Sequence, residues 1–378
     1  MNQRPPRTVL IAGGGTGGHL MPALAIATAL RGSHPDIEPV LVGAERGVEA
    51  RIFPTRDFRH HLLPAEPIYR RQWWKNLRWP FVGVRLLRRA SRLLDEERPA
   101  AVLGTGGYAS APVVWLAARR GIPTAIQEQN AFPGLATRRL SRRVRHVYLG
   151  LPEARARLRL GRTTAVFDTG NPITPPDSSR RPAARARFEL SDSRPVLLVT
   201  GGSQGAQAIN QAVSDWLDAG GGRSIQLLWA TGPAGYRQFV RHHRPPAVRV
   251  IDFLDPMADG YSVADLVVAR AGMMTGAELC AWGLPSILVP LPTAAADHQT
   301  YNAQALAQAG AASLLPQREL SGQSLAALVG ELLSDSGRRS TMAEAARRRG
   351  RPGAADDIVS HLLAIFATPP TLSQLLKG

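Results

Sequence analysis

The chain contains the same pattern of apolar residues, glycines and helix-forming residues twice, and this repeat limits the folds open to it. Residues 9–19 read VLIAGGGTGGH and residues 196–206 read VLLVTGGSQGA. In each copy an apolar run ends in glycines and continues into a stretch of helical periodicity, over 23–30 and 209–217. This order is typical of a buried parallel strand, a tight turn and a helix. We therefore predict two α/β halves of similar construction.

The length and the remaining pattern agree with two Rossmann-like domains. The 378 residues are too many for one ordinary core. Residues 171–182 read NPITPPDSSRRP, and such a segment cannot continue a helix or a central strand, so we place the linker there. The prediction is an N-terminal domain over 1–174 and a C-terminal domain over 175–350. Parallel sheets are expected in both, because helix-like segments alternate with strand-like runs at 39–42, 101–103, 124–126, 225–229, 248–251, 266–268 and 286–289.

The charge and the cysteine count narrow the class of protein. The formal net charge is +17, and all but two of the basic residues, Lys75 and Lys377, are arginine. This excess favours an anionic partner: nucleic acid, an anionic membrane surface or phosphorylated substrates. The single cysteine, Cys280, excludes an intramolecular disulfide and is typical of an intracellular chain. We expect neither a secretion signal nor a membrane-spanning segment.

Three glycine-rich turns follow apolar runs and indicate a site for phosphate and sugar. Gly13, Gly15 and Gly18 fit a dinucleotide-binding pattern. That pattern also needs an acid at the end of the second strand, where Glu38 and Glu45 are misplaced, so a dehydrogenase is disfavoured. Similar turns occur at 104–108 and 201–205. Glycines expose backbone N–H groups at helix starts, where anions bind, although any single turn can also be a plain tight connection.

A fourth motif suits a nucleoside diphosphate. Residues 270–279 read RAGMMTGAEL and open a helix after a strand-like run. A pyrophosphate fits the N–H groups near Met274 and Thr275, and Glu278, about one turn further on, can accept both hydroxyls of a ribose. The alternative for Glu278 is a carboxylate that complements the helix dipole.

With these motifs in this order, the chain resembles the MurG family, the undecaprenyldiphospho-muramoylpentapeptide β-N-acetylglucosaminyltransferases. The resemblance covers roughly residues 8–350 and rests on the segments 14–19 with Pro22, 104–108, 128–130, 170–172, 201–205, 270–278 and 297–299. It implies a GT-B fold, with two Rossmann-like domains and parallel sheets facing across a cleft. It also implies that the amphipathic stretch 354–366, within a C-terminal segment 351–378, packs back on the first domain.

The resemblance implies an inverting, metal-independent reaction in peptidoglycan biosynthesis, without a cofactor. N-acetylglucosamine would pass from UDP-N-acetylglucosamine to the 4-hydroxyl of the muramoyl sugar of lipid I, giving lipid II and UDP. In the first domain, Thr16, Gly17 and Gly18 would approach the donor and acceptor diphosphates, and Asn130 would bind the donor sugar. In the second domain the implied donor contacts are Ser203, the backbone of Leu254, Met273, Met274, Thr275, Gly276, Ala277, Glu278 and Gln299.

Two departures from the family pattern leave donor contacts open. The family often has an arginine just after its Asn-Pro motif, but Ile173 and Thr174 follow Asn171 and Pro172 here. Met273 and Met274 are also bulkier than the pair expected at that helix start, although backbone contacts would survive.

Two residues are candidates for the catalytic base. His19 starts a helix after the first glycine turn, where the neutral imidazole is favoured and can accept a proton. Glu128 is the competing base. The alternative for His19 is a hydrogen-bonded structural histidine, and the alternative for Glu128 is a carboxylate that fixes a loop. The histidines do not show the spacing of a metal site, so we assign no metal. The leaving-group charge must then be met by helix dipoles and backbone N–H groups.

The segment 69–81 mixes aromatic and basic residues, as expected of a segment at the headgroup level of an anionic membrane. The alternative is packing of the aromatics on the first domain. We predict a peripheral protein on the cytoplasmic face of the cell membrane. The residues assigned to the acceptor and membrane side are Tyr108, Trp73, Trp74, Lys75, Arg78 and Trp79.

Two other functions remain open from the sequence. A non-hydrolysing UDP-N-acetylglucosamine 2-epimerase would share the architecture, but needs more acidic and histidine groups around the sugar. A basic RNA-binding protein would explain the charge, yet the chain has no recognised RNA module, and nucleic acid is not an expected partner.

Overall fold

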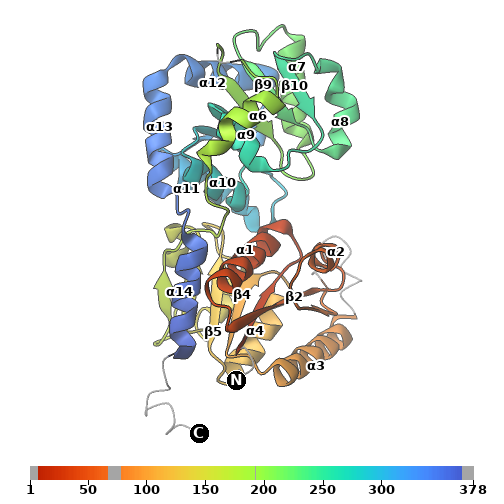
Figure 1. The fold of residues 1–378 in the computed structure, drawn as a ribbon, viewed down its shortest axis with the longest axis vertical. Coiled ribbons are helices and arrows are strands. Elements are labelled where there is room, and N and C mark those ends of the chain that lie inside the picture. The colour runs from red at the N-terminus through yellow and green to blue at the C-terminus, as the bar shows by residue number, and fades with distance from the viewer. Residues whose placement is uncertain (1–6, 67–77, 192, 368–378) are drawn as a thin grey trace. The chain divides into compact units, whose positions relative to one another are not determined.

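The computed structural model describes residues 7–66, 78–191 and 193–367, and the chain forms two compact units. The first unit consists of Met1–Ile173 and Gly353–Gly378, and the second of Thr174–Pro352. Each unit contains its own sheet of parallel strands with helices around it (Figure 1). The prediction of two α/β domains with parallel sheets is confirmed.

Among the described residues of the first unit, seven parallel strands form one sheet in the order β3-β2-β1-β4-β5-β6-β7. The strands are β1 (Arg7–Gly13), β2 (Ile37–Ala44), β3 (His60–Leu63), β4 (Ala101–Gly106), β5 (Thr124–Glu128), β6 (His146–Leu149) and β7 (Ala165–Phe167). The helices are α1 (Gly17–Ser33), α2 (Glu49–Ile52), α3 (Trp79–Glu97), α4 (Ser110–Arg119), α5 (Leu135–Leu140) and α14 (Ala354–Ala367).

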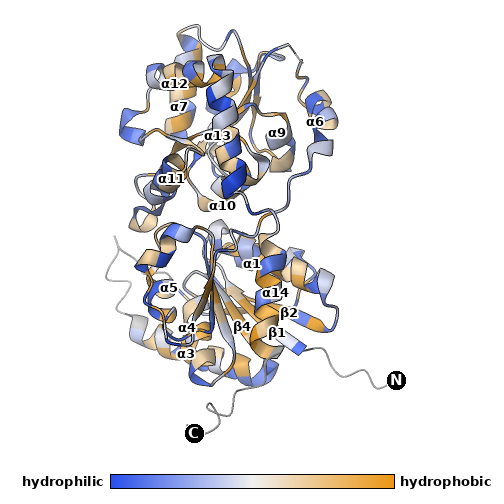
Figure 2. Cartoon of the chain, turned by 90° about the vertical axis from the view of Figure 1, so that its left-hand side faces the viewer, coloured by the Kyte–Doolittle hydropathy of each residue, from blue (hydrophilic) through white to orange (hydrophobic). Residues whose placement is uncertain are grey.

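Both faces of this sheet are covered, so its central strands are apolar throughout. Val9 and Ile11 of β1 pack with buried residues of α1 and α14. Leu10 and Ala12, whose side chains leave the opposite face, pack with α3, α4 and α5. Figure 2 shows the result as a band of hydrophobic residues along β1 and β4. An uninterrupted apolar run such as 9–12 is the pattern of a strand buried on two sides.

The second unit repeats this plan with six parallel strands in its described residues, in the order β10-β9-β8-β11-β12-β13. The strands are β8 (Val196–Thr200), β9 (Gln226–Ala230), β10 (Val248–Ile251), β11 (Leu266–Arg270), β12 (Ser286–Val289) and β13 (Ser313–Leu314). The helices are α6 (Arg181–Arg187), α7 (Gln207–Asp218), α8 (Pro233–Phe239), α9 (Met257–Val263), α10 (Met273–Trp282), α11 (His298–Gln308), α12 (Gly322–Ser334) and α13 (Ser336–Arg349).

Each sheet has a point where the strand order reverses. In the first unit this point lies between β1 and β4, and in the second it lies between β8 and β11. The loops that leave the carboxyl ends of these strand pairs run in opposite directions and open a crevice, which is where open α/β sheets bind ligands. The glycine turns at 13–18, 104–108 and 201–205 and the motif at 270–279 all lie at the carboxyl ends of these four strands.

A cluster of aromatic rings joins α14 to the edge of the first sheet. The ring of His361 stacks on Phe167, with centroids 3.8 Å apart, and His146 lies edge-on to Phe167 at 4.8 Å. Nδ1 of His146 is 3.2 Å from the hydroxyl of Tyr148. Burial, together with the nearby charges of His361 and Arg145, lowers the pKa of His146 to about 4.

We predict that His146 makes the fold less stable in mild acid. The unfolded chain binds the proton at the ordinary histidine pKa of 6.5, whereas the folded chain binds it only near pH 4. The contribution of neutral His146 to the free energy of unfolding is therefore complete above pH 6.5 and is lost as the pH falls from 6.5 toward 4. Because His146 is only half-buried, we expect a loss of about 1 kcal/mol. Thermal melting of the wild type and His146→Gln between pH 7 and 4.5 measures it; parallel curves would contradict the prediction.

Candidate functional site

The loop after β1 is held by a buried carboxylate. Glu49, the first residue of α2, is fully buried, and its two oxygens accept from the backbone N–H of Gly15 at 3.0 and 2.8 Å. Oε1 of Glu49 also accepts from the N–H of Ala44 at 2.8 Å, where β2 ends. These charge-assisted bonds fix the backbone of the loop. The sequence pattern does not single out Glu49, which belongs to no motif.

Glycine is required where the loops after β1 and β4 meet. Gly107 has a φ of +86°, and a Cβ there would lie 2.0 Å from the carbonyl oxygen of Gly14. At Gly106, with a φ of +104°, a Cβ would lie 2.5 Å from Nδ1 of His19. Gly107 therefore permits contact between the two backbones, and Gly106 leaves room for the imidazole of His19.

His19 lies in the first turn of α1, and two other segments fix its ring. Its Nδ1 is 3.1 Å from the carbonyl oxygen of Thr105 on β4 and 3.1 Å from Oε1 of Gln129, just after β5. The hydroxyl of Thr105 donates to the carbonyl oxygen of His19 at 2.8 Å. The imidazole is thus anchored at the carboxyl edge of the sheet, beside the glycine loop.

Glu128 binds the loop that follows β5. This carboxylate is buried, with 3% of the residue exposed. Oε1 accepts from the backbone N–H and the side-chain amide of Asn130, both at 3.1 Å, and Oε2 accepts from the N–H of Gly134 at 2.9 Å. Three donors on a buried carboxylate favour the loop-fixing interpretation of Glu128 over a base.

The other predicted residues of the first unit gather at the same edge. Thr16 is the N-cap of α1, and Thr16, Gly17 and Gly18 are exposed. The first N–H groups of a helix lack partners within it and attract anions. The ring of Tyr108 covers the loop, because a Cβ on Gly15 would lie 2.6 Å from Cε1 of Tyr108.

In the second unit, a pocket of about 780 Å³ opens where the strand order reverses. This volume is in the range of small-ligand pockets. Three of the predicted residues line it: Ser203, Thr275 and Gln299. Oε1 of Gln299 accepts from the N–H of Leu291 at 2.9 Å, which orients its amide. The lining further includes the whole glycine turn 201–205.

The pocket also contains a cation that the sequence analysis did not place in the site. Arg270, the last residue of β11, donates to the carbonyl oxygens of Val289 and Pro290, both at 3.2 Å, and to Oε1 of Gln317 at 2.7 Å. Burial lowers the pKa of its guanidinium. All three acceptors are neutral, so they hold the guanidinium without cancelling its charge. The motif at 270–279 contains Arg270, but nothing in its pattern gives the side chain's direction.

Glu278 and Leu254 lie outside the described lining of this pocket and contact α9 instead. Oε2 of Glu278 accepts from the hydroxyl of Tyr261 at 2.8 Å. Burial raises the pKa of Glu278, and burial and the Glu278 carboxylate raise the pKa of Tyr261. Leu254 is buried against the same helix, since a Cβ on Gly260 would lie 2.4 Å from its Cδ2. The lining also lacks four other predicted residues of α10: Met273, Met274, Gly276 and Ala277.

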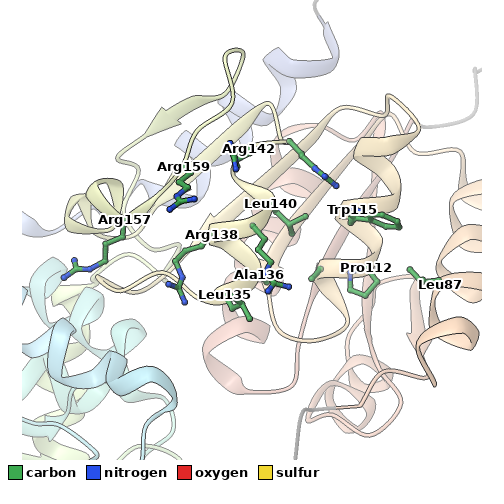
Figure 3. A pocket seen from close by; sticks show the side chains of 13 residues that line it. Leu87, Pro112, Trp115, Leu135, Ala136, Arg138, Leu140, Arg142, Arg157 and Arg159 are labelled. Atoms are coloured by element: carbon green, nitrogen blue, oxygen red, sulfur yellow. The ribbon is translucent and has the colours of Figure 1, made fainter. Parts of the chain in front are cut away.

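A second pocket, of about 1090 Å³, lies between α4 and α5 of the first unit (Figure 3). Leu87, Pro112, Trp115, Leu135 and Leu140 supply an apolar surface. Six arginines line it as well: Arg138, Arg139, Arg142, Arg143, Arg157 and Arg159. Two of these guanidinium groups, those of Arg138 and Arg157, lie over the ring of Phe132 at 5.2 Å. The pocket therefore combines an apolar surface with a high density of positive charge.

Part of the predicted membrane segment lies outside the described residues, namely Trp73, Trp74 and Lys75. Arg78 is exposed and pairs with Glu66 at 3.4 Å, and Trp79 begins α3. Within the described ranges, no helix is long and apolar enough to cross a membrane. In the same ranges, no three His, Cys, Asp or Glu side chains gather as metal ligands.

Comparison with known proteins gives one consistent result. Residues 9–149 match the glycosyltransferase family 28 N-terminal domain, and residues 196–358 match the glycosyltransferase family 28 C-terminal domain. A relative from Salinibacter ruber is 40% identical over 97% of this chain and 98% of its own length. It is named UDP-N-acetylglucosamine–N-acetylmuramyl-(pentapeptide) pyrophosphoryl-undecaprenol N-acetylglucosamine transferase.

Two solved structures bear on the fold. The crystal structure of MurG from Acinetobacter baumannii is similar with a TM-score of 0.75 and 26% identity, covering 95% of this chain and all of that one. UDP-N-acetylglucosamine 2-epimerase from Neisseria meningitidis is 14% identical with a TM-score of 0.65, covering 95% of this chain and all of its own. The second likeness extends to the fold alone.

We predict that Glu49→Gln lowers the free energy of unfolding by about 1–3 kcal/mol, because in either orientation the NH2 group of the amide faces a backbone N–H that now donates to the carboxylate, and the charge that assists these bonds is lost. The matched control is Glu45→Gln, four residues away at an exposed position, with an expected change within about 0.5 kcal/mol. Urea unfolding of both variants measures the difference. Equal stabilities would show that the buried carboxylate does not hold the loop.

Proposed function

Because this chain belongs to the MurG family of glycosyltransferase family 28, we propose that it transfers N-acetylglucosamine from UDP-N-acetylglucosamine to the 4-hydroxyl of the muramoyl sugar of lipid I, producing lipid II and UDP. The observation that carries this proposal is the 40% identity to a transferase of that name along nearly the whole of both chains. The epimerase shares only the fold, at 14% identity, so its reaction is the weaker candidate.

The second unit binds the donor. Its pocket has the volume for a nucleotide sugar, and the start of α10 supplies N–H groups and the positive end of a helix dipole for the diphosphate. Ser203 and Thr275 add hydroxyls to the same lining, and Gln299 faces the sugar hydroxyls. Arg270 adds a positive charge that is not cancelled by its neutral partners. These groups stabilise the charge that develops on UDP as it leaves, without a metal ion.

Glu278 and Leu254 hold the nucleoside part. The carboxylate of Glu278 already accepts one hydroxyl, that of Tyr261, and a ribose offers two hydroxyls of the same kind. The backbone of Leu254 reads the edge of the uracil. Because α9 contacts both residues, it sets the separation between the ribose and uracil contacts.

The first unit binds lipid I and supplies the base. Thr16, Gly17 and Gly18 bring the N-terminus of α1 to the acceptor diphosphate, and Asn130, held by Glu128, contacts the donor sugar. The hydroxyl oxygen of the acceptor forms the new bond to the anomeric carbon as the bond to UDP breaks. The proton of that hydroxyl passes to Nε2 of His19.

The exposed apolar residues of α3 and the arginine-rich pocket beside them support a peripheral position of the enzyme on an anionic membrane, at its cytoplasmic face. Phe81, Val84 and Leu87 of α3 are exposed by 82, 49 and 37%, and their spacing puts them on one side of the helix. Leu87 also lines the pocket that contains the six arginines, so this side of α3 adjoins that pocket. Apolar side chains that enter the lipid, together with arginines that meet its phosphates, make a peripheral contact.

We expect purified protein to convert UDP-N-acetylglucosamine and a lipid I analogue to a product heavier by one N-acetylglucosamine residue, with release of UDP. Mass spectrometry of the product tests the proposal. The yield should be unchanged in EDTA, because the described groups meet the leaving charge without a metal. Consumption of UDP-N-acetylglucosamine alone would indicate an epimerase. Loss of transfer in EDTA with recovery in magnesium would contradict metal independence.

We predict that His19→Asn lowers turnover by about two to four orders of magnitude, because asparagine keeps a polar group but has no basic nitrogen. UDP affinity should stay within twofold, because the nucleotide residues belong to the second unit. Steady-state kinetics and calorimetric titration with UDP provide the two measurements. If His19→Asn keeps most of its turnover, Glu128 becomes the base, and Glu128→Gln is the variant that must then be slow.

We predict that Phe81→Ser combined with Leu87→Ser weakens binding to phosphatidylglycerol vesicles by at least about tenfold, since each apolar side chain contributes about 1.5–3 kcal/mol when buried. The matched control is Phe253→Ser, which changes an exposed phenylalanine of the second unit. Cosedimentation with vesicles measures both, and phosphatidylcholine vesicles should bind the wild type less. Unchanged binding of the double variant would exclude this face of α3.

A further inference from the structure

We propose that a chain of three buried side-chain amides, acting together with the backbone carbonyl of Thr105, determines which nitrogen of His19 carries its proton. The amides belong to Gln129, Gln127 and Asn171, all 3% exposed or less. In this proposal they are positioning residues, since only Gln129 touches the imidazole and none is required to touch substrate. The inference rests on the proposed function only for its catalytic consequence, because the position of a proton can be measured without activity.

The first step concerns the imidazole itself. Nδ1 of His19 faces two oxygens, the carbonyl oxygen of Thr105 and Oε1 of Gln129, both at 3.1 Å. A carbonyl oxygen can only accept, so Nδ1 must be the donor. In the neutral ring the other nitrogen, Nε2, then has no proton and is the basic one.

The second step concerns the direction of the Gln129 amide. Its Nε2 donates to the carbonyl oxygen of Thr105 at 2.6 Å and to Oε1 of Gln127. Both amide protons are therefore used on that side, which leaves Oε1 as the atom that faces His19. If the amide were reversed, its oxygen would face two other oxygens, and its N–H groups would point at Nδ1 of His19.

The third step explains what stops the amides from reversing together. Nε2 of Gln127 donates to Oδ1 of Asn171 at 2.9 Å, and Nδ2 of Asn171 donates to the backbone carbonyl oxygen of Gln129 at 3.1 Å. A backbone carbonyl cannot exchange the roles of donor and acceptor. One such carbonyl fixes Asn171 and another, that of Thr105, fixes Gln129. The direction of every hydrogen bond between these two ends is therefore determined.

The network has a chemical consequence for the reaction. When Nε2 accepts the proton of the acceptor hydroxyl, the charge of the resulting imidazolium lies beside two oxygens that already bind Nδ1–H. No side chain has to rotate during the step, because the acceptors are in place beforehand. In serine proteases a carboxylate holds the histidine tautomer, whereas here neutral amides and a carbonyl have this role.

The experiment compares two variants with one matched control. Gln129→Met removes the acceptor next to His19 and keeps a side chain of similar length. Gln127→Met leaves Gln129 intact and removes one of the two oxygens that orient its amide, while the carbonyl oxygen of Thr105 stays in place. The control is Gln226→Met in the second unit. Like Gln129, Gln226 is buried and its side-chain amide accepts one hydrogen bond and donates two.

The direct measurement is the ring nitrogen spectrum of protein with ¹⁵N-labelled histidine at a pH where His19 is neutral. The His19 signals are assigned by their loss in His19→Asn. We expect the wild type and Gln226→Met to carry the proton on Nδ1. In Gln129→Met and Gln127→Met a fraction of the molecules should carry it on Nε2, with the larger fraction in Gln129→Met.

The second measurement is catalysis. Turnover should fall about 10- to 100-fold in Gln129→Met, comparable with the loss of a group that orients a ligating histidine, and less in Gln127→Met. UDP affinity should stay within twofold in both variants. The control should keep its turnover per folded molecule.

Several results would overturn the proposal. A wild-type His19 with its proton on Nε2 contradicts it directly, and so does an unchanged proton position in both variants. A change in Gln129→Met alone would end the chain at Gln129 and exclude a role for Gln127. If the wild type shows the expected spectrum but makes no lipid II, the positioning chain stands and the proposed function fails.

Discussion

The close approach of a neighbouring backbone to the glycine loop after the first strand of each unit, β1 or β8, is the constraint on which the candidate sites depend. In the first unit Gly107 lies against the carbonyl of Gly14, and in the second a Cβ on Gly205 would lie 2.0 Å from the carbonyl oxygen of Thr231. Any side chain at these glycines would separate the two loops. The helix that starts after each loop would then move, together with its N–H groups and, in the first unit, His19. The repeated glycine pattern of the sequence is thus a repeated steric requirement.

This requirement explains why so much of the fold could be predicted. An uninterrupted apolar run such as 9–12 or 196–199 suits a strand only if both faces of that strand are buried. Burial of both faces requires helices on both sides of the sheet, and such helices come with parallel connections between the strands. Glycines at the end of such a run then mark the crevice edge of the sheet. Both properties are local in the sequence, so periodicity and turn chemistry were sufficient to place nine of the strands of the described residues, and motif order was sufficient to identify the family. The sequence analysis missed β3, β6, β7 and β13, which lie at or next to the sheet edges.

The contacts that orient the site residues are not local, and for this reason the sequence left them open. His19 meets a residue 110 positions away, and Glu49 reaches the glycine loop from 34 positions away. Glu128 could be a base or a loop anchor until its three N–H donors were located. Arg270 belongs to a motif, yet only tertiary structure shows that neutral oxygens hold it in the pocket. Residues that act through distant partners carry no pattern of their own.

The two units treat charge in opposite ways, and the difference fits their proposed tasks. In the proposed donor pocket the described hydrogen-bond partners of the cation Arg270 are all neutral, so its charge would be available to a diphosphate that becomes more negative as the bond breaks. At Nδ1 of His19 the two oxygens belong to a backbone carbonyl and a neutral amide, and neither carries a negative charge that would favour the imidazolium before the acceptor arrives. A carboxylate at Gln129 would favour the imidazolium from the start and remove the base from part of the population. The leaving group needs a permanent charge beside it, whereas the nucleophile needs a base that becomes charged only as the reaction proceeds.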